Sequence, residues 1–108
     1  MKKIEAYIQP FMLHKVTDAL RAIHVQGMSV IDAKGFGKEK DESHPHHISD
    51  VIDFTPKVKI EIVCSEQDCK KIVEIIQESA HTGRKGDGKI LLSTIDRVIS
   101  IRTGQVDN

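Results

Sequence analysis

Apolar and polar residues alternate with a period of two along two clear stretches of the chain, and this pattern predicts strands. The first stretch covers residues 2–8, and Pro10 ends it because proline cannot donate to a strand ladder. The second stretch covers residues 57–64 and is the clearer of the two. Shorter apolar runs predict further strands over residues 28–34, 90–94 and 98–101.

Two other stretches repeat their apolar residues at steps of three and four, which predicts amphipathic helices. The apolar face of the first helix is formed by Leu13, Val16, Leu20 and Ile23. Gly27 is expected to end this helix. Ser65 fits the N-cap of the second helix, whose first turn carries Glu66 and Asp68. The apolar face of the second helix is formed by Cys69, Ile72, Val73, Ile76 and Ala80.

The predicted order is strand, helix, strand, strand, helix, strand, with a short extra strand near the end of the chain. This is the ferredoxin-like βαββαβ pattern, an α+β fold in which both helices cover one face of an antiparallel sheet. The 108 residues suffice for one such domain. On the other face the strand over 57–64 carries Lys57, Lys59 and Glu61, so solvent exposure and a polar subunit interface both remain open. The tail over residues 103–108 is expected to fray unless something binds it.

Residues 38–53 form the one long stretch without periodicity, and they are predicted to be a long loop between the second and third strands. Loops longer than about 12–15 residues are uncommon in compact domains unless they have a function, so this loop is the first candidate for a partner surface. His44, His46 and His47 are candidate metal ligands, because imidazole suits Zn, Cu and Ni. The alternative is a polar loop that happens to be rich in histidine, since a metal site also needs fixed geometry.

Two glycine-rich turns are candidate phosphate sites, because backbone amides in such turns form anion-binding concavities. The first spans residues 35–38, and the second spans residues 83–89 with Arg84, Lys85 and Lys89. Neither turn matches a P-loop or a dinucleotide-binding motif, so a simple connection between elements is the alternative interpretation. Arg102 is a further candidate, because a guanidinium matches phosphate geometry, and a solvated arginine is its alternative.

Composition narrows the possible functions. Lys and Arg number 16 and Asp and Glu number 16, so the net charge is zero, which argues against a nucleic-acid binder. The chain has no run of 18 apolar residues and no signal-peptide pattern, so we expect a cytoplasmic protein. Cys64 and Cys69 are then expected to be free thiols in the core. The common hydrolase and protease motifs are absent from the sequence, which favours a protein that is not an enzyme.

Several short segments, in order and spacing, resemble the PII nitrogen-regulatory signal-transduction proteins. They are Q-P-F at 9–11, Q-G-M at 26–28, K-G-F-G at 34–37, D-F-T-P-K-V-K-I-E at 53–61, T-G at 82–83, G-D-G-K-I at 86–90 and I-R-T-G at 101–104. The resemblance implies a single PII-like domain over residues 1–108 that forms a cytoplasmic homotrimer. It also implies a non-enzymatic regulator of nitrogen metabolism. Such a protein binds ATP or ADP between subunits and presents its loop to a membrane transporter or a nitrogen-metabolism enzyme.

The resemblance also implies roles for individual residues, carried over position by position. One side of the nucleotide cleft would be lined by Ser29, which replaces a family threonine, and by Gly35, Phe36, Gly37 and Lys38. The adenine and ribose would lie by Glu61 and Val63. The phosphates, with Mg as a possible companion, would be held by Gly86, Asp87, Gly88, Lys89 and Arg102. Lys57 would meet a carboxylate of the effector 2-oxoglutarate.

The departures from the family pattern change some of these expectations. Glu39 replaces a glutamine that helps hold Mg and 2-oxoglutarate, so we expect weak 2-oxoglutarate binding. The only tyrosine is Tyr7, so the family's tyrosine modification of the loop is not available. Ser100 replaces a basic residue before I-R-T-G, which removes one phosphate contact. The alternative function is a divergent PII-like regulator of metal or inorganic-carbon transport, with the histidines of the loop favouring metal.

Overall fold

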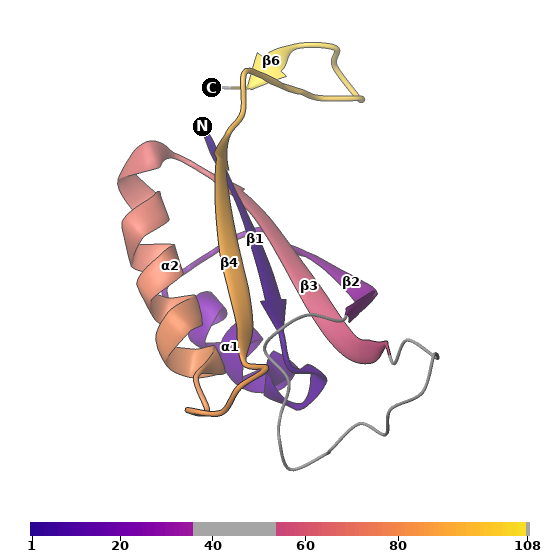
Figure 1. The fold of residues 1–108 in the computed structure, drawn as a ribbon. Coiled ribbons are helices and arrows are strands. Elements are labelled where there is room, and N and C mark those ends of the chain that lie inside the picture. The colour runs from indigo at the N-terminus through magenta and orange to yellow at the C-terminus, as the bar shows by residue number, and fades with distance from the viewer. Residues whose placement is uncertain (36–53, 108) are drawn as a thin grey trace.

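The computed structural model describes residues 1–35 and 54–107, and its elements follow the predicted βαββαβ order (Figure 1). The elements are β1 (Lys2–Ile8), the 3-10 helix η1 (Pro10–Met12), α1 (Leu13–Ala22), β2 (Ser29–Gly35), β3 (Thr55–Cys64), α2 (Glu66–Ala80) and β4 (Gly88–Thr94). The predicted α+β, ferredoxin-like fold is therefore confirmed.

The four long strands form one antiparallel sheet in the order β2-β3-β1-β4, and both helices lie against the same face of it (Figure 1). Alternate residues of the two central strands are buried, as the period of two predicted. The largest fully buried side chains are Ile4, Ile8, Val16, Leu20, Ile60, Ile62 and Ile76. The core thus lies between the sheet and the helices, and the opposite face of the sheet is left for other contacts.

The ends of two elements differ from the prediction. Helix α1 ends at Ala22, not at Gly27. His24 takes the left-handed conformation with a φ of 65°, and its N–H donates to the Arg21 carbonyl oxygen at 2.9 Å. Histidine tolerates this region better than most residues, so the chain turns before it reaches the glycine. Strand β4 begins at Gly88, two residues before the predicted start, because Gly88 pairs with Ile8 of β1.

The C-terminal segment folds back on itself as a small hairpin. Strand β5 (Val98–Ile99) pairs with β6 (Val106–Asp107) in an antiparallel arrangement. Between them the N–H of Gly104 donates to the Ser100 carbonyl oxygen at 2.7 Å. Residues 106–107 of the tail therefore have backbone partners within their own segment, and whether the tail frays stays a prediction. Figure 1 shows the hairpin extending away from the helices, beyond the end of β4.

Both cysteines are buried and free, as expected for a reduced core. Within residues 1–35 and 54–107, none of the helices has the length and apolar character needed to cross a lipid bilayer.

Candidate functional site

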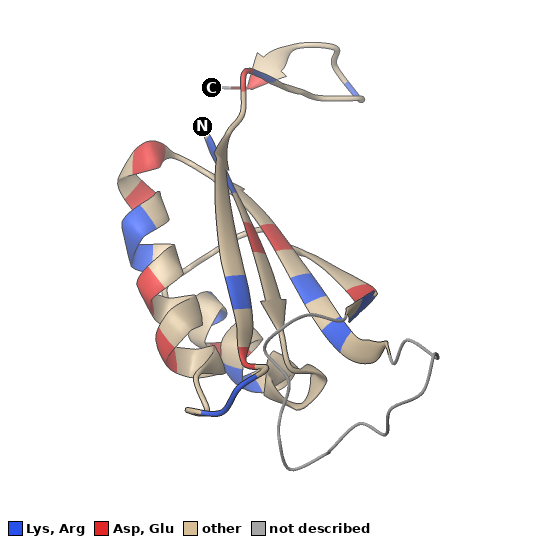
Figure 2. Cartoon of the chain, viewed as in Figure 1, with Lys and Arg blue, Asp and Glu red and all other residues tan. Residues whose placement is uncertain are grey.

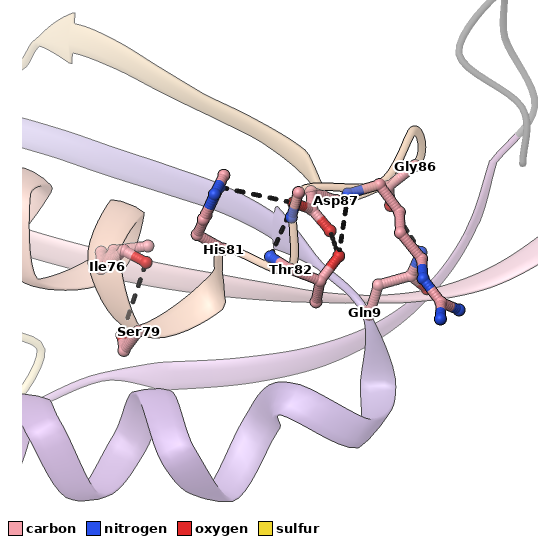
Figure 3. Close-up of polar contacts among 9 residues, drawn as sticks. Gln9, Ile76, Ser79, His81, Thr82, Gly86 and Asp87 are labelled. Atoms are coloured by element: carbon pink, nitrogen blue, oxygen red, sulfur yellow. Dashed lines mark hydrogen bonds and ion pairs between the residues drawn. The ribbon is translucent and has the colours of Figure 1, made fainter.

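The turn between α2 and β4 is organised by the carboxylate of Asp87 (Figure 3). Asp87 Oδ2 accepts the N–H of Thr82 at 2.8 Å and the N–H of Gly83 at 2.9 Å, and Oδ1 accepts the Thr82 hydroxyl. His81 Nδ1 lies 3.7 Å from Oδ2. Burial acts against ionisation of Asp87, but the hydrogen bonds from Thr82 and Gly83 outweigh it, and the pKa is lowered. The ionised side chain therefore holds the two ends of the turn together, because Asp87 at its end accepts hydrogen bonds from Thr82 and Gly83 at its start.

Two glycines hold this turn against the sheet. Gly88 has a φ of 115°, and a Cβ at this position would lie 1.7 Å from the Tyr7 carbonyl oxygen, so only glycine fits. Gly86 has a φ of 91°, and its carbonyl oxygen accepts Gln9 Nε2 at 2.6 Å and also Lys57 Nζ. The turn is thereby attached to the ends of both central strands, β1 through Gln9 and β3 through Lys57.

The face of the sheet away from the helices carries a compact ion-pair network. Lys59 Nζ lies 2.9 Å from Glu61 Oε1 and 3.7 Å from Glu5 Oε2, and Lys3 Nζ lies 3.6 Å from Glu61 Oε2. Glu5 and Glu61 are directly opposite each other in register, so the two lysines offset a repulsion between like charges. Figure 2 shows both signs side by side on the neighbouring strands. The network is neutral in sum.

The network also shifts the ionisation of its members. The hydrogen bond to Glu61 is the main cause that raises the pKa of Lys59. The same bond lowers the pKa of Glu61, against an opposing effect of burial and with a further contribution from Lys3. Lys59 Nζ also lies 5.9 Å from the centre of the Tyr7 ring. Both charges are therefore maintained over the neutral pH range.

Some of the predicted site residues lie close together in the sheet. Ser29, at the start of β2, is directly opposite Glu61 in register. Val63 follows on the same face and is 43% exposed. Lys89 is exposed and is opposite Tyr7, which in turn is opposite Lys59. The candidate adenine and phosphate contacts thus occupy adjacent rows of one sheet face.

Other predicted residues lie apart from this group. Gly35 is at the far end of β2, opposite Thr55. Arg102 follows β4 in the β5–β6 hairpin, whereas the glycine turn precedes β4. The seven residues of β4 span about 20 Å at the usual rise of a strand. One chain therefore does not bring Arg102 to the glycine turn.

A hollow of about 490 Å³ lies beside the start of β3. It is lined by Pro10, Asp32, Ala33, Lys34, Pro56, Lys57 and Val58. Lys57 thus contributes to the wall of this hollow and to the glycine turn through its bond to the Gly86 carbonyl oxygen. Neither Gln9 nor Thr82 was predicted to have a role, although both belong to segments that carry the family resemblance.

The remaining predicted residues lie outside the described residues: Phe36, Gly37, Lys38, Glu39, His44, His46 and His47. Within residues 1–35 and 54–107, no group of three or more His, Cys, Asp or Glu side chains is arranged to hold a metal ion. The metal interpretation of the loop therefore stays a prediction.

Comparison with known proteins places these features in a family. Residues 1–105 match the family described as "Nitrogen regulatory protein P-II". Similar proteins of that name come from Rhizobium meliloti (46% identical) and Rhodospirillum rubrum (48% identical). Each similarity extends over 106 residues, which is 97% of this chain and 95% of the relative. The family match covers the glycine turn and the hairpin as far as residue 105, just before β6.

Proposed function

Because the chain belongs to the nitrogen regulatory protein P-II family, we propose that it is a non-enzymatic regulator that binds ATP or ADP between the subunits of a homotrimer. Its output is the presentation of residues 38–53 to a partner protein, such as a membrane transporter or a nitrogen-metabolism enzyme. Membership of the family implies regulation of nitrogen metabolism by signal transduction. Bound nucleotide would shift the population of loop conformations that a partner recognises.

The observation that carries the nucleotide proposal is the construction of the glycine turn. A phosphate needs backbone atoms that it can approach closely, and residues 86–88 include two glycines of positive φ, which carry no side chain to cover the backbone. The carboxylate of Asp87 accepts hydrogen bonds from Thr82 and Gly83, and the exposed cations of this segment are Arg84, Lys85 and Lys89, of which Lys89 follows Gly88 in β4. The turn is thus suited to an anion, with Lys89 supplying the positive charge.

The position of Arg102 supports a site that is shared between subunits. Lys89 and Arg102 lie toward opposite ends of β4, so a phosphate that contacts both must lie between two chains. The open sheet face supports the same conclusion, because its network of Lys3, Glu5, Lys59 and Glu61 is neutral in sum. A neutral network can be covered by another subunit without leaving an unpaired charge.

Calorimetry on the purified wild-type protein tests this function directly. We expect saturable binding of ADP and of ATP with Mg, and Lys89→Ala should weaken both by about ten-fold or more, because a charge-assisted hydrogen bond contributes ~1.5–3 kcal/mol. Lys70→Ala, on the exposed side of α2, is the matched control and should leave affinity unchanged. Absence of nucleotide binding to the folded wild type would overturn the proposal.

The effector 2-oxoglutarate is expected to bind weakly. Lys57 lies on the wall of the hollow, but Glu39 adds a negative charge where the family has a glutamine. Glu39→Gln should therefore strengthen 2-oxoglutarate binding in the presence of Mg-ATP, because it removes a like charge near a dianion. Tight binding to the wild type, measured by the same calorimetry, would show that Glu39 does not oppose this ligand.

A further inference from the structure

The carbonyl oxygen of Gly86 is held by two side chains from the ends of the central strands. Gln9 Nε2 donates to it at 2.6 Å, and Lys57 Nζ donates to it as well. A carbonyl oxygen has two lone pairs, so it can accept both donors. This oxygen belongs to the peptide bond between Gly86 and Asp87, and the two side chains therefore fix the orientation of that peptide bond.

The orientation of this carbonyl group also fixes the N–H group of Asp87. None of the described peptide bonds is cis, and in a planar trans peptide the C=O and N–H groups point in opposite directions. The Asp87 N–H is therefore directed away from Gln9 and Lys57. Within residues 1–35 and 54–107 this N–H has no hydrogen-bond acceptor, although the carboxylate of Asp87 accepts bonds from Thr82 and Gly83. The turn thus has an unused backbone donor on the side opposite Gln9.

The backbone of Gln9 gives its side chain a fixed starting point. Gln9 directly follows β1, and its carbonyl oxygen accepts the N–H of Met12 at 2.9 Å. Pro10 restricts the residue before it to extended conformations, and Gln9 has a φ of −67° and a ψ of 136°. The amide of Gln9 therefore reaches Gly86 from a backbone that is held on both sides.

Gln9 and Lys57 differ in their response to an anion. Lys57 is charged and also lines the hollow beside β3, so an anion that binds nearby attracts it away from the Gly86 oxygen. The amide of Gln9 is neutral and keeps its bond to that oxygen. Gly86, with a φ of 91°, has no Cβ to limit rotation of the peptide bond, so a side-chain donor is needed to maintain one orientation.

We propose that Gln9 is a positioning residue for nucleotide binding: it holds the peptide bond between Gly86 and Asp87 so that the Asp87 N–H donates to a phosphate oxygen. The inference rests on the proposed function, which supplies the phosphate. Hydrogen bonds from backbone N–H groups to an anion are charge-assisted and strong. Loss of the Gln9 amide lowers the population of the competent orientation, and the apparent affinity falls by the same factor.

The test compares the wild type with Gln9→Met, which keeps a side chain of similar length but removes the N–H donor. Calorimetry should show that ADP affinity is weakened about three- to ten-fold, the range expected for the loss of one neutral hydrogen bond. Gln77→Met, on the exposed side of α2, is the matched control and should bind ADP as the wild type does. Unchanged ADP affinity in a folded Gln9→Met variant would overturn the proposal.

The NMR resonance of the Asp87 amide is a readout that a general loss of stability would not change in the same way. In isotope-labelled wild type, ADP should move the Asp87 amide proton downfield, as a new hydrogen bond does. Gln9→Met should start from a different position and reach the same one at saturation, because ADP selects the same orientation. An Asp87 amide that does not move when the wild type is saturated would overturn the proposal without any variant. Absence of ADP binding to the folded wild type would instead overturn the proposed function, and this inference with it.

Discussion

The segments at the two ends of strand β4 are stabilised by different kinds of contact. At its start the glycine turn is fixed by the rest of the chain: Gly88 lies against β1, and the Gly86 carbonyl oxygen accepts side chains from both Gln9 and Lys57. At its end the β5–β6 hairpin is held by local backbone bonds and exposes Ile99 and Ile101, at 59% and 102%. The turn is held by contacts within one chain, whereas the hairpin exposes apolar side chains that residues 1–35 and 54–107 leave uncovered.

This difference explains why a proposed site can include residues from both ends. The turn needs no second subunit to take its shape, so it can act as the rigid half of a phosphate site. The hairpin carries Arg102 on a small two-stranded unit, and isolated hairpins are only marginally stable in water. In the proposed trimer the hairpin would gain order where it meets a neighbouring turn.

The largest expected effect is the loss of stability when the glycine at the start of β4 is replaced by alanine, compared with the same change in the hairpin after β4. Gly88→Ala should cost about 3–5 kcal/mol of unfolding free energy, because the new Cβ would meet the Tyr7 carbonyl oxygen at 1.7 Å in a conformation that favours glycine. Gly104→Ala in the hairpin should cost only about 1 kcal/mol, since its φ is 71° but no atom lies within 4 Å of the added Cβ. Urea denaturation of both variants checks the difference, and equal losses would contradict it.

A mixing experiment tests whether the two ends meet across subunits. Lys89→Ala and Arg102→Ala should each weaken ADP binding by about ten-fold or more, because each removes a charge-assisted contact. Co-expression of the two variants at equal levels should restore full affinity in about one quarter of the clefts, since each cleft takes the two residues from different subunits. Calorimetric titration of the mixed assembly gives this fraction. If no tight sites return, Lys89 and Arg102 do not act on one ligand from two chains.

Asp87→Asn should destabilise the turn by about 1–2 kcal/mol at neutral pH, because hydrogen bonds to an ionised group are lost. The pKa of Asp87 is lowered on folding, so its contribution is complete above the unfolded value of ~3.9 and is lost as the pH falls toward the folded value. Urea denaturation at pH 7 and at pH 3 should therefore show a smaller difference between wild type and variant in acid. A larger difference in stability between wild type and variant at pH 3 would show that a group other than the Asp87 carboxylate stabilises the turn.

The smallest effect is expected for Gln9→Ala. Removal of Gln9 Nε2 leaves Lys57 as a donor to the Gly86 carbonyl oxygen, so the loss should be about 1 kcal/mol. Gln77→Ala, on the exposed side of α2, is the matched control and should be neutral. Thermal unfolding and ADP calorimetry on the two variants measure whether the turn depends on Gln9, and identical behaviour of the pair would show that it does not.

The sequence by itself determined the elements whose signals are local. Apolar alternation located β1 and β3, and steps of three and four located the buried faces of α1 and α2. The Ser65 cap was also predictable, because a hydroxyl before an acidic first turn acts only a few residues away. The element order then led to the ferredoxin-like fold. These features depend on neighbouring residues, so the pattern of one stretch is sufficient to predict them.

Tertiary structure alone decided how the glycine turn is held. The Gly86 carbonyl oxygen is bound by Gln9, 77 residues away, and by Lys57, 29 residues away, and neither separation has a signature in the sequence. The need for glycine at 88 comes from the Tyr7 carbonyl oxygen, which approaches only because β1 and β4 pair in this register. The same register places Glu5 opposite Glu61 across β1 and β3. The register of strand pairing is set by how all the buried side chains pack together. Contacts between paired strands can therefore be identified only in the folded chain.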